Sequence, residues 1–430
     1  MKICFISPKG NITKDDDLNN FLLTSSNYLF RYFYNGISTG LLILAALTPP
    51  SFEIKIIDEN EEQINFKEHF DLIVLTAMTQ QATRAYFIAD EFRRKGTKVV
   101  IGGIHASILP EEAKGHTDSV LIGEGEKIWL DFINDFITGD IKPFYKNNDL
   151  IDIKMSPIPR YDLLIKYNYK IIWVQATRGC PHNCIFCAAS KIFGTKYRRK
   201  DIDQVIKEIE YIQNIWSKPQ INFADDNIFV DKEYSLKLIE RLIPLNIRWA
   251  AQTDITTVQD KQFINLLKES GCVSLFIGFE TIKEEGLDLI NNKTKKGKLT
   301  EYSEIITSIQ SKGIGILGAF IIGFDTDRVS IFDELANFII ENNLYTAQIT
   351  ILTPLPGTLI REQLEKENRL INTNWDNYTF TNVNFIPKNM TPSELLEGLK
   401  QVYKKVYDKK VVHNRMRYFK KIYKDLYLSK

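Results

Sequence analysis

The sequence lacks several features that would define whole classes of protein. It has only five cysteines in 430 residues, an odd number, so a disulfide framework is not expected. No apolar run approaches the roughly 18 to 20 residues that span a bilayer, and the N-terminal MKICFISPKG has too short an apolar stretch for a signal peptide. The chain also has almost no excess of either charge, because its 55 basic residues are balanced by 54 acidic ones. No chain-wide field therefore attracts nucleic acid. We expect a cytoplasmic protein, or one that touches a membrane only peripherally.

What is present is the composition of a folded chain. The hydrophobic fraction is 44% and the charged fraction 25%, values typical of globular domains. A chain of this length favours two or three domains of roughly 150 residues each. We predict a first domain at 1–140, a polar linker at 141–168 that contains three prolines, a second domain at 169–365 and a C-terminal appendage at 366–430.

Three of the cysteines, Cys180, Cys184 and Cys187, lie within eight residues in a C-x3-C-x2-C pattern. Zinc sites usually take four ligands in paired short spacings, and no second pair follows; His182 inside the loop could only supplement the set. Iron–sulfur clusters are held by thiolates, normally four for a cubane. Three thiolates would leave one iron open to an external ligand. The remaining two, Cys4 and Cys272, lie in apolar segments and are expected to be buried.

The first domain alternates short apolar strands with helical segments, which predicts a doubly wound parallel, Rossmann-like α/β sheet. Ligands of such sheets bind beyond the carboxyl ends of the strands, and glycines there allow close approach of the backbone. No G-x-G-x-x-G follows the first strand, so a nicotinamide site is disfavoured. We expect strands at 2–7, 53–58, 71–76, 98–101 and 119–122, ending in Thr76-Ala77-Met78, Gly102-Gly103-Ile104-His105 and Gly123-Glu124-Gly125-Glu126.

The same alternation resumes at residue 171 and predicts six more strands. Six strand-and-crossover units suit a partial (β/α)6 barrel, whose site lies at the carboxyl ends of its strands. We expect these strands at 171–175, 221–224, 248–252, 273–278, 314–322 and 347–352. Small or polar residues that fall within these strands or directly after them are Ala224, Asp225, Asp226, Gln252, Glu280, Gly318 and Gly323, and Leu352 ends the last strand.

Residues 177–187, TRGCPHNCIFC, resemble the cluster loop of radical S-adenosylmethionine (SAM) enzymes, including the aromatic Phe186 before the third cysteine. The resemblance implies a [4Fe-4S] cluster on Cys180, Cys184 and Cys187, whose open iron chelates SAM. Cleavage of SAM would then give methionine and a 5′-deoxyadenosyl radical, with electrons from a donor such as a flavodoxin or ferredoxin. The implied SAM contacts are Phe186, Ala224, Asp225, Asp226, Gln252, Glu280, Gly318, Gly323 and Leu352. Among them an acidic pair, Asp225-Asp226, replaces the usual small-small-acidic sequence.

Together with this loop, residues 1–140 resemble the cobalamin-binding domain that precedes many radical SAM domains. The implied cobalamin contacts are Thr76, Ala77, Met78, Gly102, Gly103, Ile104, His105, Gly123, Glu124, Gly125 and Glu126. The D-x-H-x-x-G loop of cobalamin mutases is absent, so cobalt would lack a histidine ligand from that motif. His105 would line the pocket.

The resemblance, which extends to the hopanoid methylase group, implies an enzyme that methylates an unactivated carbon of a small molecule. One SAM would methylate cobalamin, and a second would generate the radical that activates the substrate. Two alternatives remain open. The same cofactors could serve a cyclase or rearrangement enzyme without methyl transfer, or the chain could be a cobalamin or cluster sensor without turnover.

The C-terminal segment 401–430 carries eight lysines and two arginines against two aspartates, with tyrosines interleaved. A basic, aromatic helix can lie on an anionic membrane surface, which would suit an apolar lipid substrate. The same pattern fits a solvated helix that packs its tyrosines on the barrel. No nucleic-acid recognition motif accompanies the charge.

Overall fold

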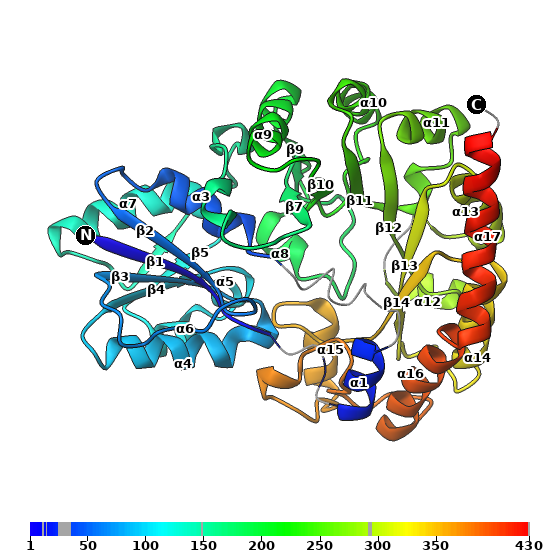
Figure 1. Ribbon diagram of the computed structural model, residues 1–430. Coiled ribbons are helices and arrows are strands. Elements are labelled where there is room, and N and C mark those ends of the chain that lie inside the picture. Colours follow the sequence, from blue (N-terminus) through cyan, green and yellow to red (C-terminus); the bar gives the residue numbers. More distant parts are fainter. Residues whose placement is uncertain (11–12, 14, 25–35, 148, 291–294, 429–430) are drawn as a thin grey trace.

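Two parallel six-stranded sheets, each with helices packed around it, form the frame of the protein, and helices at the C-terminus lie along the outer edge of the second sheet (Figure 1). The computed structural model describes residues 1–430 except 11–12, 14, 25–35, 148, 291–294 and 429–430. No described helix is long and apolar enough to cross a membrane.

The first sheet has the strand order β2-β1-β3-β4-β5-β6, with every pairing parallel. Its strands are apolar on both faces because helices cover both: Ile3 and Phe5 pack in one cluster, Cys4 and Ile6 in another. The doubly wound sheet and the burial of Cys4 are therefore confirmed. The strands are β1 (Lys2–Ser7), β2 (Glu53–Asp58), β3 (Leu72–Thr76), β4 (Lys98–Gly102), β5 (Ser119–Ile122) and β6 (Phe144–Lys146), and the helices are α1 (Asp16–Thr24), α3 (Thr39–Leu47), α4 (Ala82–Arg93), α5 (Ile104–Ile108), α6 (Pro110–His116) and α7 (Gly125–Thr138).

One strand of this sheet escaped prediction. β6 lies in the segment 141–168, which the sequence predicts to be a polar linker, and it pairs in parallel with β5 at the sheet edge. Three residues, Phe144–Lys146, are too few to carry an alternation signal in the sequence, so only the pairing with β5 reveals the strand.

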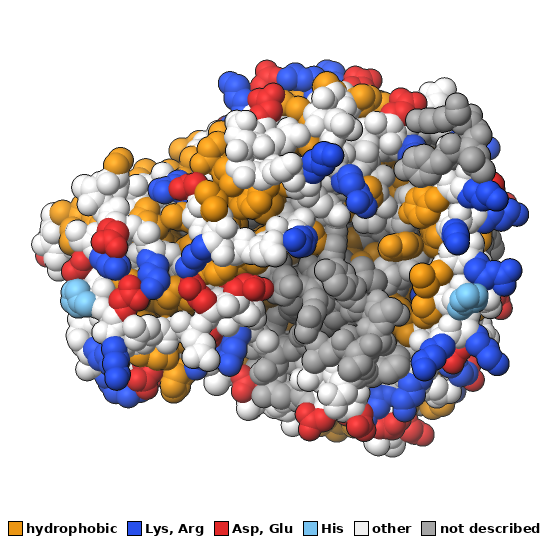
Figure 2. Space-filling model, in the orientation of Figure 1, with side chains coloured by type: hydrophobic (Ala, Val, Ile, Leu, Met, Phe, Trp, Pro, Cys, Tyr) orange, Lys and Arg blue, Asp and Glu red, His pale blue; other side chains and the backbone are white. Residues whose placement is uncertain are grey.

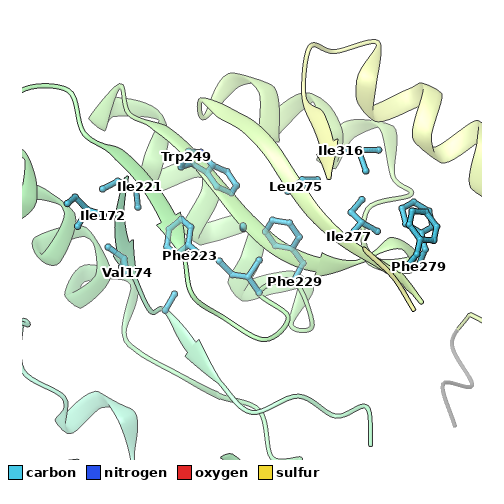
Figure 3. Packing of buried hydrophobic residues seen from close by; sticks show 14 of the residues in the cluster. Ile172, Val174, Ile221, Phe223, Phe229, Trp249, Leu275, Ile277, Phe279 and Ile316 are labelled. Atoms are coloured by element: carbon cyan, nitrogen blue, oxygen red, sulfur yellow. The ribbon is translucent and has the colours of Figure 1, made fainter. Parts of the chain in front are cut away.

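The second sheet has the order β14-β13-β12-β11-β10-β7, again entirely parallel, as a partial (β/α)6 barrel requires. Figure 3 shows buried side chains of neighbouring strands packed together, among them Phe223, Trp249 and Ile277. The strands are β7 (Ile171–Val174), β10 (Gln220–Phe223), β11 (Arg248–Asp254), β12 (Cys272–Glu280), β13 (Gly315–Ile322) and β14 (Thr346–Ile351), and the helices are α9 (Ile202–Ile215), α10 (Lys232–Leu242), α11 (Lys261–Glu269), α12 (Glu284–Leu289), α13 (Tyr302–Gln310) and α14 (Ile331–Glu341).

The third of these strands is longer than predicted. Gln252 does not end β11, because Thr253 and Asp254 continue the ladder opposite Ile277 and Gly278 of β12. The strand therefore places Asp254, and not Gln252, at the carboxyl edge. Cys272 is buried at the start of β12, as expected.

The C-terminal appendage forms two helices, α16 (Pro392–Val406) and α17 (Lys409–Leu428), and the basic helix predicted at 401–430 covers the end of the first and the second. Thr391 and Glu394 form a reciprocal capping box at the start of α16. The hydroxyl of Tyr403 donates to the carbonyl of Ile349 at 2.8 Å, and that of Tyr407 to Ala347 at 2.7 Å. These two tyrosines thus pack on the β14 edge of the barrel. α15 (Leu359–Lys366) and a short 3-10 turn at Trp375–Asn377 precede α16.

Candidate active site at the facing sheet edges

The cysteine loop is held at its base by a two-stranded hairpin. β8 (Thr177–Arg178) enters the loop, α8 (Ala189–Phe193) follows it, and β9 (Arg198–Arg199) pairs antiparallel with β8. Between β8 and the first cysteine, Gly179 has a φ of +89°, and a Cβ there would collide with the carbonyl oxygen of Lys196. Only glycine fits this close crossing, so the hairpin fixes where the loop begins.

The three thiols of the loop fit a cluster better than a single ion. All are free and half-buried. No three His, Cys, Asp or Glu side chains of the described residues converge as the ligands of one metal ion do. A cubane, in contrast, is held by separate thiolates, and three thiols suit three of its irons. Burial raises the pKa of Cys180 to about 11 and that of Cys184 to about 12. The free thiols are thus protonated at neutral pH, and bound iron would supply the charge that stabilises the thiolates.

Two elements from the far end of the barrel support this loop. The ring of Phe186 lies 6.4 Å from that of Phe324, which follows β13. The backbone N–H of Ile360, at the start of α15, donates to the carbonyl of Ile185 at 3.1 Å. Phe186 is therefore brought close to the end of the predicted Gly318–Gly323 segment.

The acidic pair after β10 lies directly under the loop. Asp225 is buried and accepts the backbone N–H groups of Ala176, at 3.2 Å, and Thr177. Burial raises its pKa to about 7 despite these bonds. Burial also raises the pKa of Asp226, although the N–H of Gly179 and the charge of Arg178 oppose the shift. Asp225 thus anchors the strand that enters the loop, whereas Asp226 is half-buried and accepts the N–H of Gly179 inside the loop.

A buried cluster of charges occupies the ends of β11 and β12. The ammonium of Lys295 lies 3.1 Å from Asp254 and 3.4 Å from Glu280, and it donates to the carbonyl of Gly278 at 2.6 Å. Burial raises the pKa of Glu280. At Asp254 burial acts in the same direction, but the charge of Lys295 and the hydrogen bonds from Thr256 together outweigh it and hold that pKa below its usual range. Glu280 also has a φ of +67°, an uncommon conformation for a residue with a side chain.

Sequence reasoning found Glu280 but missed its two partners. Asp254 became visible only with the true end of β11, and Lys295 lies in a lysine-rich segment that reads as solvated surface. The cluster lies near the cysteine loop: the charges of Asp254 and Lys295 both act on the pKa of His182, which is part of the loop.

The remaining residues predicted to contact SAM differ in how exposed they are. Gln252 is exposed, whereas Gly318 lies in the core, where a Cβ would meet Phe320 at 2.8 Å. Leu352 is buried as well. Gly323 has a φ of +98°, and its N–H donates to Asp327 at 2.8 Å. Asp327, which the sequence did not single out, therefore shapes this turn. Ala224 follows β10 and donates its N–H to Val174 at 2.8 Å. Contacts of these residues with SAM stay predictions.

Most of the residues predicted to contact cobalamin lie at the carboxyl edge of the first sheet; His105, Glu124 and Glu126 are the exceptions. Gly103, with a φ of +92°, lies so close to the loop after β3 that a Cβ would be 3.0 Å from the nitrogen of Ala77. Met78 is 42% exposed, and Ile104 is half-buried. Gly123 has a φ of +89° and open space where its Cβ would stand. An edge of backbone, glycine and apolar side chains suits a large, flat ligand. The other residues at this edge are Thr76, Ala77, Gly102 and Gly125.

His105 is not presented to this edge. Its side chain is fully buried, with Nε2 3.1 Å from the carboxylate of Glu112 and Nδ1 3.3 Å from the hydroxyl of Thr79. Burial lowers its pKa, and the carboxylate opposes the shift. With both ring nitrogens occupied, this histidine is not placed to bind cobalt.

Glu124 and Glu126 also turn away from the edge. Their carboxylates are buried against Arg178, which donates to Glu124 at 2.8 Å and to Glu126 at 2.9 Å. Arg178 stands two residues before Cys180. The predicted cobalamin edge and the cysteine loop are thus joined directly. α5 contacts α8 beside this junction, and a Cβ at Gly357 would lie 3.0 Å from Ile108.

The sequence matches two families that correspond to these two edges. Residues 30–132 match the B12 binding domain, and residues 174–339 match the radical SAM superfamily. Residues 358–429, which include α16 and α17, match a domain of unknown function.

Relatives cover most of the chain. The bacteriochlorophyllide d C-12(1)-methyltransferase of Chlorobaculum tepidum is 30% identical over 88% of this chain and 84% of its own length. The hopanoid C-2 methylase of Rhodopseudomonas palustris is 23% identical over 87% and 73%. The anaerobic magnesium-protoporphyrin IX monomethyl ester cyclase of Cereibacter sphaeroides is 23% identical over 80% and 60%.

A solved structure shares the arrangement of both sheets. The radical S-adenosylmethionine methyltransferase TsrM from Kitasatospora setae, with cobalamin and a [4Fe-4S] cluster bound, superposes with a TM-score of 0.65 at 15% identity, over 86% of this chain and 79% of that one. The fold expected from the sequence is confirmed. This chain therefore belongs to the radical SAM superfamily, in the group whose members carry a B12-binding domain ahead of the radical SAM domain.

Proposed function

We propose that this enzyme is a cobalamin-dependent radical SAM C-methyltransferase that acts on an unactivated carbon of a small molecule. The observation that carries the proposal is the direct junction of the B12-binding edge with the cysteine loop through Arg178 and Glu126. Its cofactors are a [4Fe-4S] cluster, SAM and cobalamin, and when bound they supply a 5′-deoxyadenosyl radical and a transferable methyl group. Two cofactors on facing edges can act on one substrate between them.

Within this proposal the residues of the chain bind and orient. Cys180, Cys184 and Cys187 would hold the cluster. The carboxyl of Asp226, whose pKa burial raises, would pair with the ammonium of SAM, and that positive charge would restore its ionised form. Thr76 to Met78 and Gly102 to Ile104 would contact cobalamin through backbone and apolar groups.

The first test is cofactor content. After anaerobic reconstitution and desalting, we expect about four irons and one cobalamin per chain. Methyl-labelled SAM added to the reduced protein should then transfer its label to cobalamin, which chromatography of the extracted cofactor detects. Four irons without cobalamin would remove the methyl carrier and contradict the proposal.

The cyclase alternative keeps a specific basis, because one relative is named a magnesium-protoporphyrin ester cyclase. The labelling experiment separates the two functions without knowledge of the substrate. A cyclase would retain cobalamin but leave it unlabelled. The sensor alternative is disfavoured, since the relatives described above are named as enzymes.

The identity of one relative as a hopanoid methylase supports an apolar substrate class, reached through contact of α17 with an anionic membrane. Because Tyr403, Tyr407 and Phe419 face the barrel, charge and not aromatic insertion would drive this contact. Lys and Arg side chains gather on the right-hand side of Figure 2, and Lys420, Lys421 and Lys424 of α17 are exposed.

The membrane proposal can be tested without disturbing the fold. Reversal of Lys420, Lys421 and Lys424 to Glu should abolish co-sedimentation with vesicles that contain anionic phosphatidylserine. Reversal of three exposed lysines elsewhere, Lys67, Lys127 and Lys261, should leave it intact. Equal sedimentation of the two variants would argue against a membrane role for α17.

A further inference from the structure

A buried network of charges lies between the two domains. Arg178 donates through one nitrogen to Glu124 at 2.8 Å and through the other to Glu126 at 2.9 Å. Arg198 donates to both oxygens of Glu124 at 2.8 Å. The four side chains are between 3% and 8% exposed. Two carboxylates from the end of the first sheet thus meet two guanidinium groups from the β8–β9 hairpin of the second domain.

Further hydrogen bonds fix both carboxylates from the segment between the domains. Glu124 accepts the N–H of Ile151 at 3.0 Å, and Glu126 accepts the hydroxyl of Ser156 at 2.8 Å. Arg198 also donates to the carbonyls of Ile151 and Phe193, at 2.9 and 2.8 Å. The network therefore ties three segments, 124–126, 151–156 and 178–198, at one point.

Stability alone gives little reason to bury four charges. Apolar residues of similar volume are often as stabilising as a buried ion pair, because desolvation of the charges offsets their attraction. What the charges provide is geometry. Each guanidinium is planar and its N–H groups point in fixed directions, so it binds carboxylates in few orientations. Directional ion pairs of this kind fix the relative position of two domains more tightly than an apolar contact does.

The positions of Arg178 and Arg198 show which parts of the molecule the network holds together. Arg178 and Arg198 are paired across the β8–β9 hairpin, and Arg178 is followed by Gly179 and the first cysteine of the loop. On the other side, Glu124 and Glu126 flank Gly125 directly after Gly123 at the B12-binding edge. The backbone from either end of the network to its predicted cofactor site is only one to three residues long.

We propose that Glu124 and Glu126 are positioning residues, which set the spacing between the cysteine loop and the cobalamin edge through Arg178 and Arg198. The proposal rests on the proposed function in that it takes the edge as the site of cobalamin. Radical and methyl group must reach the same carbon within about 3 to 3.5 Å, and a displacement of 1 Å can lower a rate about a hundredfold. A rigid link between the two cofactor edges meets that demand.

The test uses Glu126→Gln, which keeps the shape of the side chain and removes its charge. The matched control is Glu208→Gln. Glu208 is also buried. It pairs with Lys200 at 2.7 Å, immediately after β9, and accepts the hydroxyl of Tyr161 at 2.6 Å, and both of these partners lie outside the first domain. A gentler variant, Ser156→Ala, removes one hydrogen bond to Glu126 and leaves every charge in place.

The first readout needs no cofactor. In the apoprotein, we expect Glu126→Gln to speed amide hydrogen exchange at least tenfold in residues 119–126 and also in 176–180. Glu208→Gln should leave 119–126 unchanged. If Glu126→Gln does not fold, as judged by circular dichroism, Ser156→Ala should show a smaller increase in the same two segments.

The second readout is the magnetic coupling between the reduced cluster and cob(II)alamin in the reconstituted protein. We expect equal iron and cobalamin contents in wild type and Glu126→Gln, with a weaker and broader coupling in the variant. Exchange and coupling that both match wild type would overturn the positioning role. Loss of cobalamin from wild type would instead contradict the proposed function, and exchange in the apoprotein would then decide the positioning role alone.

Discussion

Trp375, in the C-terminal appendage (366–430), lies edge-on to His105 of the first domain, with ring centroids 5.2 Å apart. Its indole N–H donates to Glu112 at 2.9 Å, and the same carboxylate accepts the hydroxyl of Tyr86 at 3.0 Å. Burial favours the neutral carboxyl, but these donors and His105 outweigh it and hold the pKa of Glu112 below its usual range. The C-terminal appendage is thus joined to the B12-binding domain beside the loop Gly102 to His105.

We expect Trp375→Phe to lower the free energy of unfolding by about 1 to 3 kcal/mol, the usual cost of losing a hydrogen bond to a charged group. Phenylalanine keeps the ring contact with His105 but has no N–H for Glu112. Urea denaturation of the apoprotein measures the change. Trp216→Phe, at a half-buried tryptophan of the second domain, is the control. Equal losses in both variants would mean that ring volume, and not the hydrogen bond, matters.

Lys295→Met should destabilise the apoprotein by about 3 to 5 kcal/mol, because removal of one partner leaves buried charge uncompensated. The lysine stands between Asp254 and Glu280. Addition of Glu280→Gln should recover part of the loss, since one of the two stranded carboxylates is then neutral. Denaturation of the two single variants and the double variant forms the cycle. Strict additivity would show that the two side chains are not coupled.

Asp327 predicts a pH dependence. Burial raises the pKa of its carboxyl to about 6, against the opposing N–H groups of Gly323 and Phe324. The folded state therefore keeps a proton that the unfolded state, with a pKa of about 4, has released. Stability from this group falls as pH rises from about 4 to 6, by about 1 to 3 kcal/mol, and is flat above.

Asp327→Asn carries no titrating group and still accepts both N–H groups. The difference in unfolding free energy between wild type and this variant should thus shift against wild type between pH 4 and 6. Denaturation of the apoprotein at pH 4.5, 5.5 and 7 suffices. A difference that is constant with pH would place the pKa of Asp327 at its ordinary value.

Cys184→Ala should prevent retention of the cluster, because a cubane with two protein thiolates is poorly held. Iron analysis after reconstitution should fall well below the wild-type content. Cys272→Ala, at a buried cysteine of β12 outside the loop, should retain iron and lose only packing stability. Iron retained in Cys184→Ala at the wild-type level would exclude this cysteine as a ligand.

The fold and the cysteine loop were legible in the sequence for a local reason. Parallel strands that are buried on both faces, such as β3 and β13, appear in the sequence as continuous apolar runs. The three cysteines of the loop lie within one short stretch of sequence. The sequence also placed Asp225, Asp226 and Glu280 near strand ends. β6 was missed because three residues carry no period, and the break between α16 and α17 left no proline or glycine to mark it.

The sequence by itself determined which residue types could bind the cofactors, since a motif is a property of neighbouring positions. Only the tertiary structure decided what the side chains of Glu124, Glu126 and His105 do. Each stands in a glycine-rich segment that predicts a ligand site, yet each is buried against a partner 7 to 74 positions away. A buried charge is stable only where its partner is brought to it. For Glu124 and Glu126 that depends on how the first domain packs against the β8–β9 hairpin, and for His105 on how α5 packs against α6.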